Sequence, residues 1–326
     1  TICDDAPVPR ISSLLEPVGR VEGKPERLTE NARIAFQGCI VLGKGFILEP
    51  EEAREWIAED PHNAEVLFPY LNGEDLNSRS DCSASRWVVD FNERSQEVAR
   101  QYKMPWQRVF DEVRPERVVK DAEKYPRMVN EWWKYWNSRS AMRKAVAGLG
   151  DLITITRHTK TLMPCRVSSR QVLSDALVVF AVDSYVQQAV LSSSLHQDWA
   201  ITYGSTLETR VRYTPSDVFE TFPRPEPTAE LDVIGRTLDT ERREIMLRRE
   251  LGLTKLYNLV NDPGLEAGTD PDVDRMRAIH VELDAAVAAA YGWEDLDLTH
   301  GFHTYRKMTR WTVPPATRVE ILDRLL

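Results

Sequence analysis

Three charged side chains occupy alternate positions in the segment TLETRVRYTPSDVFETF, which covers residues 206–222. If this segment contains a β-strand, Glu208, Arg210 and Arg212 project from one face, because successive side chains of a strand point to opposite sides. A guanidinium can donate two hydrogen bonds to guanine O6 and N7, and a carboxylate can accept one from the cytosine amino group. The spacing therefore suits the reading of base edges in a major groove. A surface salt-bridge ladder of little energetic value is the alternative, and the spacing alone slightly favours it.

The histidines offer weaker candidates for chemistry. His300 and His303, in the sequence H-G-F-H, could bind a metal ion, but no Cys or Glu at helical spacing completes a set of ligands. His196 follows three serines, yet the chain has no G-x-S-x-G elbow and no spacing that supplies an acidic third member. His158 lies in a strand-like run beside basic residues and could contact a phosphate. For the other histidines we expect structural roles, and we expect no metal site.

Two sets of catalytic residues that act on DNA are missing from the sequence. A nuclease centre needs clustered carboxylates with a lysine, and the best imitation, Asp198 with the distant Glu208, is followed by no E-x-K. Transfer of a methyl group to a base amino group needs an N/D-P-P-Y/F loop and a glycine-rich loop for S-adenosylmethionine. The stretch VPPA at 313–316 has the prolines, but it lacks the polar residue before them and the aromatic residue after them. We therefore expect no catalytic residue and no cofactor in this chain.

Length and composition indicate an ordinary folded protein. The 326 residues can form one large domain or two smaller ones, and 42% apolar with 29% charged residues is typical of soluble domains. No apolar run approaches the roughly 18 residues that cross a membrane, and the N-terminus lacks a signal pattern. Cys3, Cys39, Cys82 and Cys165 are scattered, which favours reduced thiols in the cytoplasm over a zinc site or disulfides.

The net charge of −9 argues against a protein that coats phosphates nonspecifically. The charge is unevenly distributed: residues 1–91 have 9 Lys or Arg against 17 Asp or Glu, whereas residues 92–150 have 13 against 8. The basic segment could form a local anion-binding face. On charge alone, a solvated helical surface is the simpler interpretation.

The elements that must position these side chains are of mixed type. Strands are expected at 86–91, 152–160, 163–167 and 176–182, within 201–213 and, as two short strands, at 299–313. Helices are expected at 50–60, 92–112, 126–148, 185–200, 229–251, 272–291 and 314–326. Trp132, Trp133 and Trp136 fall on or near one face of the third helix, where aromatic residues usually belong to a core. The pattern predicts the α+β class, with a mixed sheet and flanking helices followed by a mainly helical C-terminal region.

Three prolines within Pro223–Pro227 mark the clearest boundary in the chain, because proline interrupts both helices and strands. We predict a connector at 1–30, a mixed α and β domain at 31–226 and a helical domain at 227–326.

Two glycine-containing segments are predicted to contain turns. At 34–48 the glycines follow a G-x-x-x-x-G-x-G spacing that fails both nucleotide-binding fingerprints, so tight hairpin turns between short strands are expected. In the segment VLFPYLNGEDLNSRSDCSASRWVVDF, at 66–91, a polar N-G-E-D turn precedes a strand. We expect Gly73 and nearby Asn and Asp side chains to set the geometry of this turn.

A series of motifs in a fixed order carries a family resemblance. The motifs are FQGCIVLGKGFIL (36–48), VLFPYLNGEDLNSR (66–79), SRWVVDF (85–91), VRPER (113–117), WWKYW (132–136), KTLMP (160–164), SSSLHQDWAITYGSTLETRVRYTPSDVFETFPRP (192–225), LTKLYNLVNDP (253–263) and HGFHTYRKMTRW (300–311). Together they resemble the C-terminal portion of MmeI-like type IIL restriction–modification enzymes and related N6-adenine DNA methyltransferases. The resemblance covers nearly all of the chain after about residue 32.

The resemblance implies a target-recognition domain for double-stranded DNA, followed by a helical tail. In the family, the strand after the S-S-S-x-H-x-x-W motif reads bases, which matches Glu208, Arg210 and Arg212 here. A neighbouring segment also contributes, at about Asp175 and Ala176. With the resemblance, base reading outweighs the salt-bridge ladder. Phosphate contacts that set the register on DNA are expected among Arg157, His158, Lys160, Arg166 and Arg170.

The resemblance also implies a longer parent protein. In the family, one polypeptide carries a nuclease domain, a helical connector and an N6-adenine methyltransferase domain before the recognition domain. Such a parent would use S-adenosylmethionine, and Mg²⁺ for cleavage, and its own N-terminal domains would be partners of this chain. Two other hypotheses remain open: the recognition domain of a phage-defence methyltransferase without a nuclease, and a helical scaffold that holds a partner through 229–251 and 272–291.

Overall fold

Short strands in the middle of the chain form two four-stranded sheets and one three-stranded sheet. The computed structural model describes residues 2–3, 6–7, 24–207, 210–305 and 308–326. The strands are β1 (Ile2–Cys3), β2 (Ala6–Pro7), β3 (Ala35–Gln37), β4 (Ile47–Leu48), β5 (Leu67–Leu71), β6 (Arg86–Val89), β7 (Asp151–Thr156), β8 (His158–Thr159), β9 (Cys165–Ser168), β10 (Val172–Leu173), β11 (Leu177–Phe180), β12 (Ser205–Leu207), β13 (Arg210–Arg212), β14 (Gly301–Tyr305) and β15 (Met308–Thr312).

Two of the three sheets are connected through one residue. The first sheet has the strand order β10–β5–β6–β4, and it is mixed because β10 runs parallel to β5 while the other neighbours are antiparallel. The second has the order β3–β11–β7–β9, and the third has the order β12–β13–β8. Only Arg157 separates the end of β7 from the start of β8, so the third sheet continues from the second.

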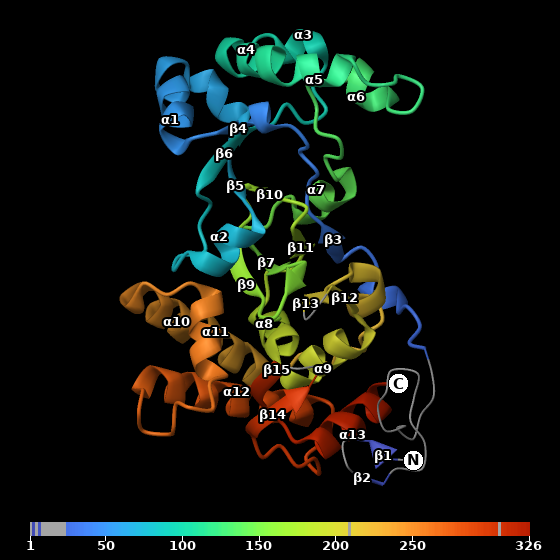
Figure 1. Ribbon diagram of the computed structural model, residues 1–326, viewed down its shortest axis with the longest axis vertical. Coiled ribbons are helices and arrows are strands. Elements are labelled where there is room, and N and C mark those ends of the chain that lie inside the picture. Colours follow the sequence, from blue (N-terminus) through green and yellow to red (C-terminus); the bar gives the residue numbers. More distant parts are fainter. Residues whose placement is uncertain (1, 4–5, 8–23, 208–209, 306–307) are drawn as a thin grey trace.

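The helices gather mainly at the two ends of an elongated molecule (Figure 1). One end carries α1 (Pro50–Glu59), α3 (Gln96–Ala99), α4 (Lys103–Glu112), α5 (Arg114–Val118) and α6 (Pro126–Asn130). The other carries α10 (Ala229–Arg249), α11 (Leu253–Val260), α12 (Pro271–Ala290) and α13 (Pro315–Leu325). The same end also carries α8 (Tyr185–Ser192) and α9 (Ser194–Tyr203), whereas α2 (Gly73–Ser78) and α7 (Ser140–Val146) lie between the two ends. The predicted α+β class and the mainly helical C-terminal region are confirmed.

The predicted N-G-E-D turn is the start of α2, which Asn72 caps. The Asn72 side-chain oxygen accepts hydrogen bonds from two backbone N–H groups of the first turn, at 2.8 and 3.0 Å. The carboxylate of Asp75 accepts a hydrogen bond from the Ser85 N–H at 2.9 Å. These polar roles are therefore confirmed. Gly73 has a different role from the one predicted, because it leaves space for a neighbour: a Cβ there would lie 3.0 Å from the Cγ2 of Thr156.

The predicted hairpin turns at 34–48 are wrong. Strand β3 pairs with β11 and strand β4 pairs with β6, so the residues between them carry the chain from one sheet to the other. Gly43 has a φ of 151°, and a Cβ on Gly45 would lie 2.5 Å from the Cβ of Glu112. The glycines thus allow this segment to pass close to the end of α4 rather than to reverse its direction.

The predicted helix at 126–148 is interrupted, and its tryptophans lie in a loop. Helix α6 ends before them and α7 begins after them. Trp132 and Trp133 are buried in this loop, and the ring of Trp132 packs against that of Trp106 with centroids 4.9 Å apart. Trp136 is half-buried and meets Tyr125 edge to face. The predicted core role is confirmed for the first two tryptophans, although the helix is not.

A buried arginine holds this loop in place. The guanidinium of Arg117, on α5, donates hydrogen bonds to the carbonyls of Val41 (3.1 Å) and Leu42 (2.6 Å), and also to those of Trp132 (3.0 Å) and Lys134. Arg117 is 2% exposed, and burial lowers its pKa to about 10. One side chain therefore satisfies carbonyls in two irregular segments, which are otherwise joined by the bridge between Ile40 and Asn137.

The C-terminal helices pack directly on the mixed α and β part of the chain that precedes them. A Cβ at Gly235 of α10 would lie 2.0 Å from the carbonyl oxygen of Tyr185, which shows how closely α10 crosses α8. Leu231 and Ile234 of α10 belong to the same apolar core as Ala189 of α8. Residues 31–226 and 227–326 thus share a core, and the domain boundary between them stays a prediction.

The end of the predicted connector at 1–30 lies against the segment that follows β13. The Leu28 N–H donates to the Glu220 carbonyl at 2.7 Å. The side-chain amide of Asn31 donates to the Phe222 carbonyl at 2.7 Å, and Asn31 is fully buried. Much of the connector lies outside the described residues.

Two of the histidines considered above, His196 and His300, have structural partners. His196 makes two contacts of 2.9 Å, from Nδ1 to the Leu191 carbonyl and from Nε2 to the Tyr213 hydroxyl, so neither ring nitrogen is available to activate Ser194. His300 Nε2 lies 2.9 Å from Asp284 Oδ2. Among the described residues, no group of three or more His, Cys, Asp or Glu could hold a metal ion, and no helix is long and apolar enough to span a membrane.

Replacement of Arg117 tests the role assigned to it. We expect Arg117→Met to lower the free energy of unfolding by roughly 3 to 5 kcal/mol, because four carbonyls, three of them in buried hydrogen bonds, lose this donor. The exposed neighbour on the same helix, Arg114→Met, should cost less than about 1 kcal/mol. Urea unfolding at neutral pH measures both, and equal losses in the two variants would contradict the assignment.

Acid should weaken the fold through His196 and His280. Burial lowers the pKa of both to about 4, whereas the unfolded chain protonates near 6.5. Their contribution is complete above pH 6.5 and is lost as pH falls toward 4, by about 2 kcal/mol for each histidine between pH 7 and 5. For His300, burial lowers the pKa, but the hydrogen bond and the charge of Asp284 outweigh burial and raise it overall. Its smaller contribution to the free energy of unfolding is therefore present below pH 6.5 and is lost as pH rises through the raised pKa.

Urea titrations at pH 7 and pH 5 test this account. His280→Gln can keep the hydrogen bond to the Tyr257 hydroxyl, which is 2.9 Å from the ring nitrogen in the native protein. The variant should lose less stability than the native protein on acidification. The same loss in both proteins would exclude His280 as a source of the pH dependence.

Candidate nucleic-acid interface

The three-stranded sheet presents a face of basic side chains. In β13, Arg210 and Arg212 are exposed, whereas Val211 between them is 1% exposed. Arg212 lies opposite His158 of β8 in the antiparallel register, so the two side chains emerge on the same face. The alternation predicted for Arg210 and Arg212 is therefore present. Glu208, the third member of the predicted set, lies outside the described residues.

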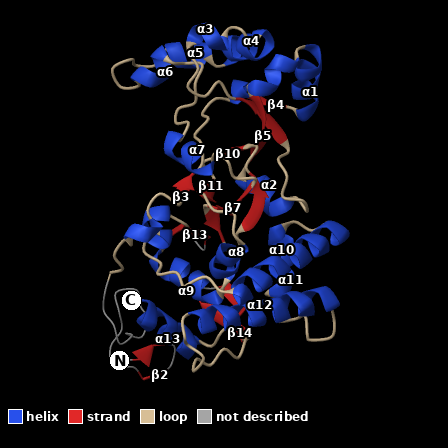
Figure 2. Cartoon of the chain, turned by 180° about the vertical axis from the view of Figure 1, so that it is seen from behind, coloured by secondary structure: helices blue, strands red, loops and turns tan. Residues whose placement is uncertain are grey.

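The second predicted segment meets this sheet at Arg157. The Arg157 N–H donates to the Ala176 carbonyl at 2.8 Å, and the Arg157 carbonyl accepts from the Tyr213 N–H at 2.8 Å. One backbone hydrogen bond thus joins the segment of Asp175 and Ala176 to the β7–β8 junction. A second joins this junction to the residue after β13. Figure 2 shows the same grouping from behind, with β11, β7 and β13 together beside β3. We call Arg157, His158, Arg210 and Arg212 the basic face.

Residues 174–176 form a turn whose backbone is held from two sides. The Gly38 N–H donates to the Leu177 carbonyl at 3.0 Å, and the Cys39 N–H donates to the Leu173 carbonyl at 2.7 Å. On the other side, the Ser174 N–H donates to the Leu71 carbonyl at 2.9 Å. A Cβ at Gly38 would lie 2.1 Å from the Ser174 carbonyl oxygen, so only glycine permits this approach. The turn is thereby fixed, while Asp175 is half-buried and Ala176 is exposed.

The basic face carries concentrated positive charge. Burial, then the charges of Arg157, Arg212 and Arg210, lower the pKa of His158. Burial and the charge of Arg212 likewise lower the pKa of Arg157, and the carboxylate of Asp175 opposes this effect. These side chains lie close enough to repel one another, so an anion placed among them would be favoured.

Sequence reasoning missed two residues beside this face. The Arg139 Nη2 donates to the Gln37 Oε1 at 2.7 Å, and the Gln37 Nε2 donates to the Asp175 carbonyl at 3.2 Å. The charge of Arg139 contributes to the lowered pKa of Arg157. Arg139 lies 18 positions before Arg157 in the sequence, in a predicted helix, so nothing in the spacing indicated that they meet.

Two of the predicted phosphate contacts are exposed, at different distances from the face. Lys160 follows β8 directly and is exposed, one residue after the buried Thr159. Arg170 follows β9, and its neighbour Ser168 pairs with the start of β7, whereas Arg157 follows the end of β7. The six residues of β7 separate Arg170 from Arg157 by roughly 20 Å along the strand, so Arg170 is not part of the basic face.

Arg166 does not fit a phosphate contact. Its side chain is 8% exposed and makes ion pairs with Asp151 (3.4 Å), Asp183 and Asp239 (3.9 Å). A guanidinium so surrounded is already neutralised and shielded from solvent. Two of these partners are Asp239, on α10, and Asp183, three residues after the end of β11.

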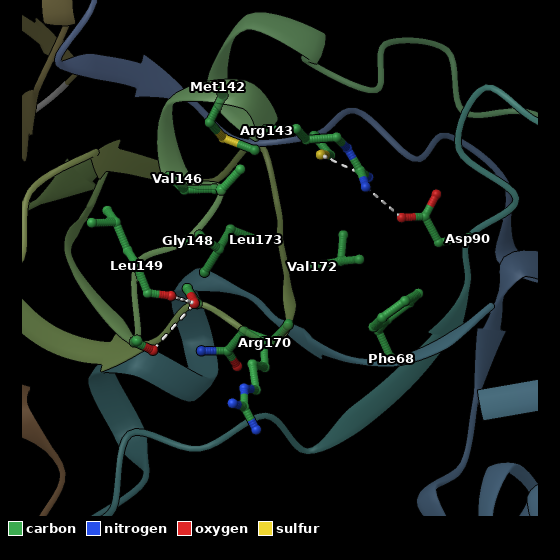
Figure 3. A pocket seen from close by; sticks show the side chains of 15 residues that line it. Phe68, Asp90, Met142, Arg143, Val146, Gly148, Leu149, Arg170, Val172 and Leu173 are labelled. Atoms are coloured by element: carbon green, nitrogen blue, oxygen red, sulfur yellow. Dashed lines mark hydrogen bonds and ion pairs between the residues drawn. The ribbon is translucent and has the colours of Figure 1, made fainter. Parts of the chain in front are cut away.

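A cavity of about 520 Å³ opens between α7, β5 and β10 (Figure 3). Its polar groups are paired with one another: Arg143 Nη1 lies 2.7 Å from Asp90 Oδ2, and the Cys39 thiol donates to the Ser138 carbonyl at 3.3 Å. Burial raises the pKa of the Cys39 thiol, which disfavours the reactive thiolate. Arg170 lies at the rim, apart from the ion pair (Figure 3). The lining gives no reason to place chemistry in this cavity.

The pKa of His158 reports on the basic face. We expect Arg212→Gln to raise it, because the substitution removes one of the charges that disfavour the imidazolium. An NMR titration of the imidazole signals measures the change. Arg54→Gln, on α1 at a distance from this face, removes the same charge and should leave the pKa of His158 unaltered. An unchanged value in Arg212→Gln would show that the two side chains do not meet in solution.

Comparison with known proteins places this arrangement in a family. A family model described as the MmeI target recognition domain matches residues 19–226, which include the 174–176 turn and the basic face. A solved structure of the type IIL restriction–modification enzyme MmeI in complex with DNA has 18% sequence identity and a TM-score of 0.65, over 98% of this chain and 38% of that one. The chain therefore spans less than half of that protein, and no curated protein sequence matches it. The resemblance noted in the sequence is confirmed, and the chain belongs to the MmeI target recognition domain family.

Proposed function

We propose that this chain is the sequence-reading module of a longer DNA-modifying enzyme and that it reads base edges in the major groove of double-stranded DNA. The observation that carries the proposal is the meeting of three predicted segments. Arg212 lies opposite His158, and Arg157 lies between the strand of Arg212 and the turn that carries Asp175. A rigid, basic strand face next to an exposed turn suits recognition that depends on position.

The chemistry of these side chains indicates which bases they prefer. Arg210 and Arg212 can each donate two hydrogen bonds to guanine, and the carboxylate of Asp175 can accept one from a cytosine amino group. Ala176, being small and exposed, can contact a thymine methyl group. Glu208 would provide a second carboxylate beside the arginines. We therefore expect a recognised site that contains G·C pairs.

The acidic total charge is compatible with this role. With a net charge of −9, the chain cannot rely on a broad phosphate field, which supplies most nonspecific affinity. Each good base contact contributes roughly 1–3 kcal/mol of discrimination, so a few contacts suffice for specificity. Lys160, next to the basic face, remains our candidate for a phosphate contact, with His158 and Arg157. Other domains of the parent would clamp the duplex from the opposite side.

We further propose that the parent is a cytoplasmic type IIL restriction–modification enzyme with an N6-adenine methyltransferase domain and a nuclease domain before this chain. Support comes from the family and from the share of the MmeI structure that this chain spans. The parent would use S-adenosylmethionine, and Mg²⁺ for cleavage. The alternative parent, a phage-defence methyltransferase without a nuclease, would contain the same recognition module. The upstream reading frame would distinguish the two kinds of parent.

A helical scaffold function has less support. Helices α10 and α12 bury apolar side chains such as Leu238 and Leu283 in the core of this chain. Val233 and Leu247 of α10 are exposed, at 65% and 48%, but they are isolated apolar side chains on a charged helix. A scaffold without a DNA role would show no sequence preference in the experiment below.

Selection from a duplex library with a randomised centre tests the proposal. The chain should enrich one site containing G·C pairs. Glu208→Lys combined with Arg210→Asp should change the preferred base pair at one position and leave the others unaltered, because the charge pattern at that contact is reversed. The old base pair should be bound roughly 5- to 150-fold more weakly by the double variant.

Arg54→Gln serves as the control for a change of charge away from the basic face, and it should enrich the native site. Absence of any enriched sequence would overturn the proposal. An unchanged site in the double variant would show that β13 does not read bases.

A further inference from the structure

Arg139 is held at the edge of the interface by groups that do not neutralise it. Its Nη2 donates to the Gln37 Oε1 at 2.7 Å, and its Nε donates to the Gly38 carbonyl at 3.3 Å. Both acceptors are uncharged. Within the part of the chain that the structure describes, Arg139 makes no ion pair, whereas the next arginine, Arg143, is paired with Asp90 at 2.7 Å.

The backbone at Arg139 adopts a conformation that is uncommon for its residue type. Its φ of 54° lies in the left-handed region. The Arg139 N–H donates to the Asn137 side-chain oxygen at 2.9 Å, and Asn137 exchanges backbone hydrogen bonds with Ile40, at 3.0 and 3.1 Å. Two fixed segments thus hold the residue in this conformation, and the side chain is directed toward Gln37 beside the 174–176 turn.

The distance from Arg139 to the basic face can be estimated by following the hydrogen bonds from one segment to the next. Gln37 of β3 lies beside Asp175, the turn lies beside Arg157, and Arg157 lies beside Tyr213 at the end of β13. Three steps between neighbouring strands correspond to roughly 14 Å. The major groove is about 12 Å wide, so a face centred on β13 and the turn would bring Arg139 to the phosphates that border the groove.

We propose that Arg139 is a phosphate contact that sets the position of the 174–176 turn over the base pairs. The inference rests on the proposed function and adds a residue that the sequence motifs did not indicate. Gln37 is a positioning residue in this arrangement: one end of its amide holds the guanidinium, and the other end holds the Asp175 carbonyl. The phosphate contact and the reading turn are therefore connected through one side chain.

A phosphate contact has a signature that distinguishes it from a base contact. Each phosphate neutralised by a cation contributes about 0.9 to the slope of log K against log[salt] on B-DNA, and its loss weakens binding to all sequences alike. We expect Arg139→Gln to reduce the slope by about 1 and to leave the sequence preference unchanged. Arg139→Lys keeps the charge and should restore the slope in large part.

The experiment uses the whole chain and two duplexes, the site enriched from the library and a scrambled version of it. Binding is measured over a range of NaCl concentrations for the native chain, Arg139→Gln, Arg139→Lys and the charge control Arg54→Gln, after thermal melts have shown that each is folded. Equal weakening on both duplexes with a shallower slope in Arg139→Gln alone supports the proposal.

Three results would count against it in separable ways. If the native chain shows no preference for the enriched site, the proposed function fails. If the preference is present but Arg139→Gln has the same slope as Arg54→Gln, Arg139 makes no phosphate contact and the proposed function is unaffected. If Arg139→Gln changes the preferred sequence at an unchanged slope, Arg139 reads a base and the phosphate assignment is wrong.

Discussion

The close approach of Gly38 to the Ser174 carbonyl is the constraint on which the interface depends. The chain must bring β3 against the 174–176 turn so tightly that a Cβ at Gly38 would lie 2.1 Å from the carbonyl oxygen. Once it does, the hydrogen bonds of Gly38 and Cys39 to Leu177 and Leu173 fix the turn on one side. The β7–β8 junction fixes it on the other. The side chains at 175 and 176 can then vary without loss of backbone hydrogen bonds.

Unneutralised charge at the interface contrasts with the rest of the molecule. Elsewhere, buried and half-buried arginines have partners: Arg166 contacts three aspartates, Arg117 contacts four carbonyls, and Arg143 is paired with Asp90. Arg157 and Arg212 make no ion pair within the described ranges of the chain. An acidic protein can therefore present a local cationic face, because its acidic residues lie on helices and in internal ion pairs elsewhere. Total charge is a poor guide to such a site.

Regular elements and the order of the motifs could be predicted from the sequence, whereas contacts across the chain could not. Helices α10 and α12 carry side-chain caps at Thr228 and Asp270, α1 begins with a proline, and β13 carries its alternation. The glycines at 34–48 fit a hairpin or a crossing between sheets equally well, and only the partners of β3 and β4 decide. The loop with Trp132 was taken for a helix because its stabilising contact comes from Arg117, in another helix.

The interface shows the same division. The shared face of Arg210 and Arg212 could be predicted because a strand alone orients them, and Asp175 was proposed through the family resemblance. Arg139 was missed since its place depends on a tether to Gln37, about 100 residues earlier in the chain. Arg166 was misjudged because one of its partners, Asp239, lies on α10, more than 60 residues later in the chain.

A structure of the chain bound to its preferred duplex tests the central claim most directly. The account predicts that β13 and the 174–176 turn face the major groove, with the guanidinium groups of Arg210 and Arg212 within hydrogen-bond distance, about 3 Å, of base edges. A duplex bound on another face, or contacts from these two arginines to phosphates alone, would contradict it.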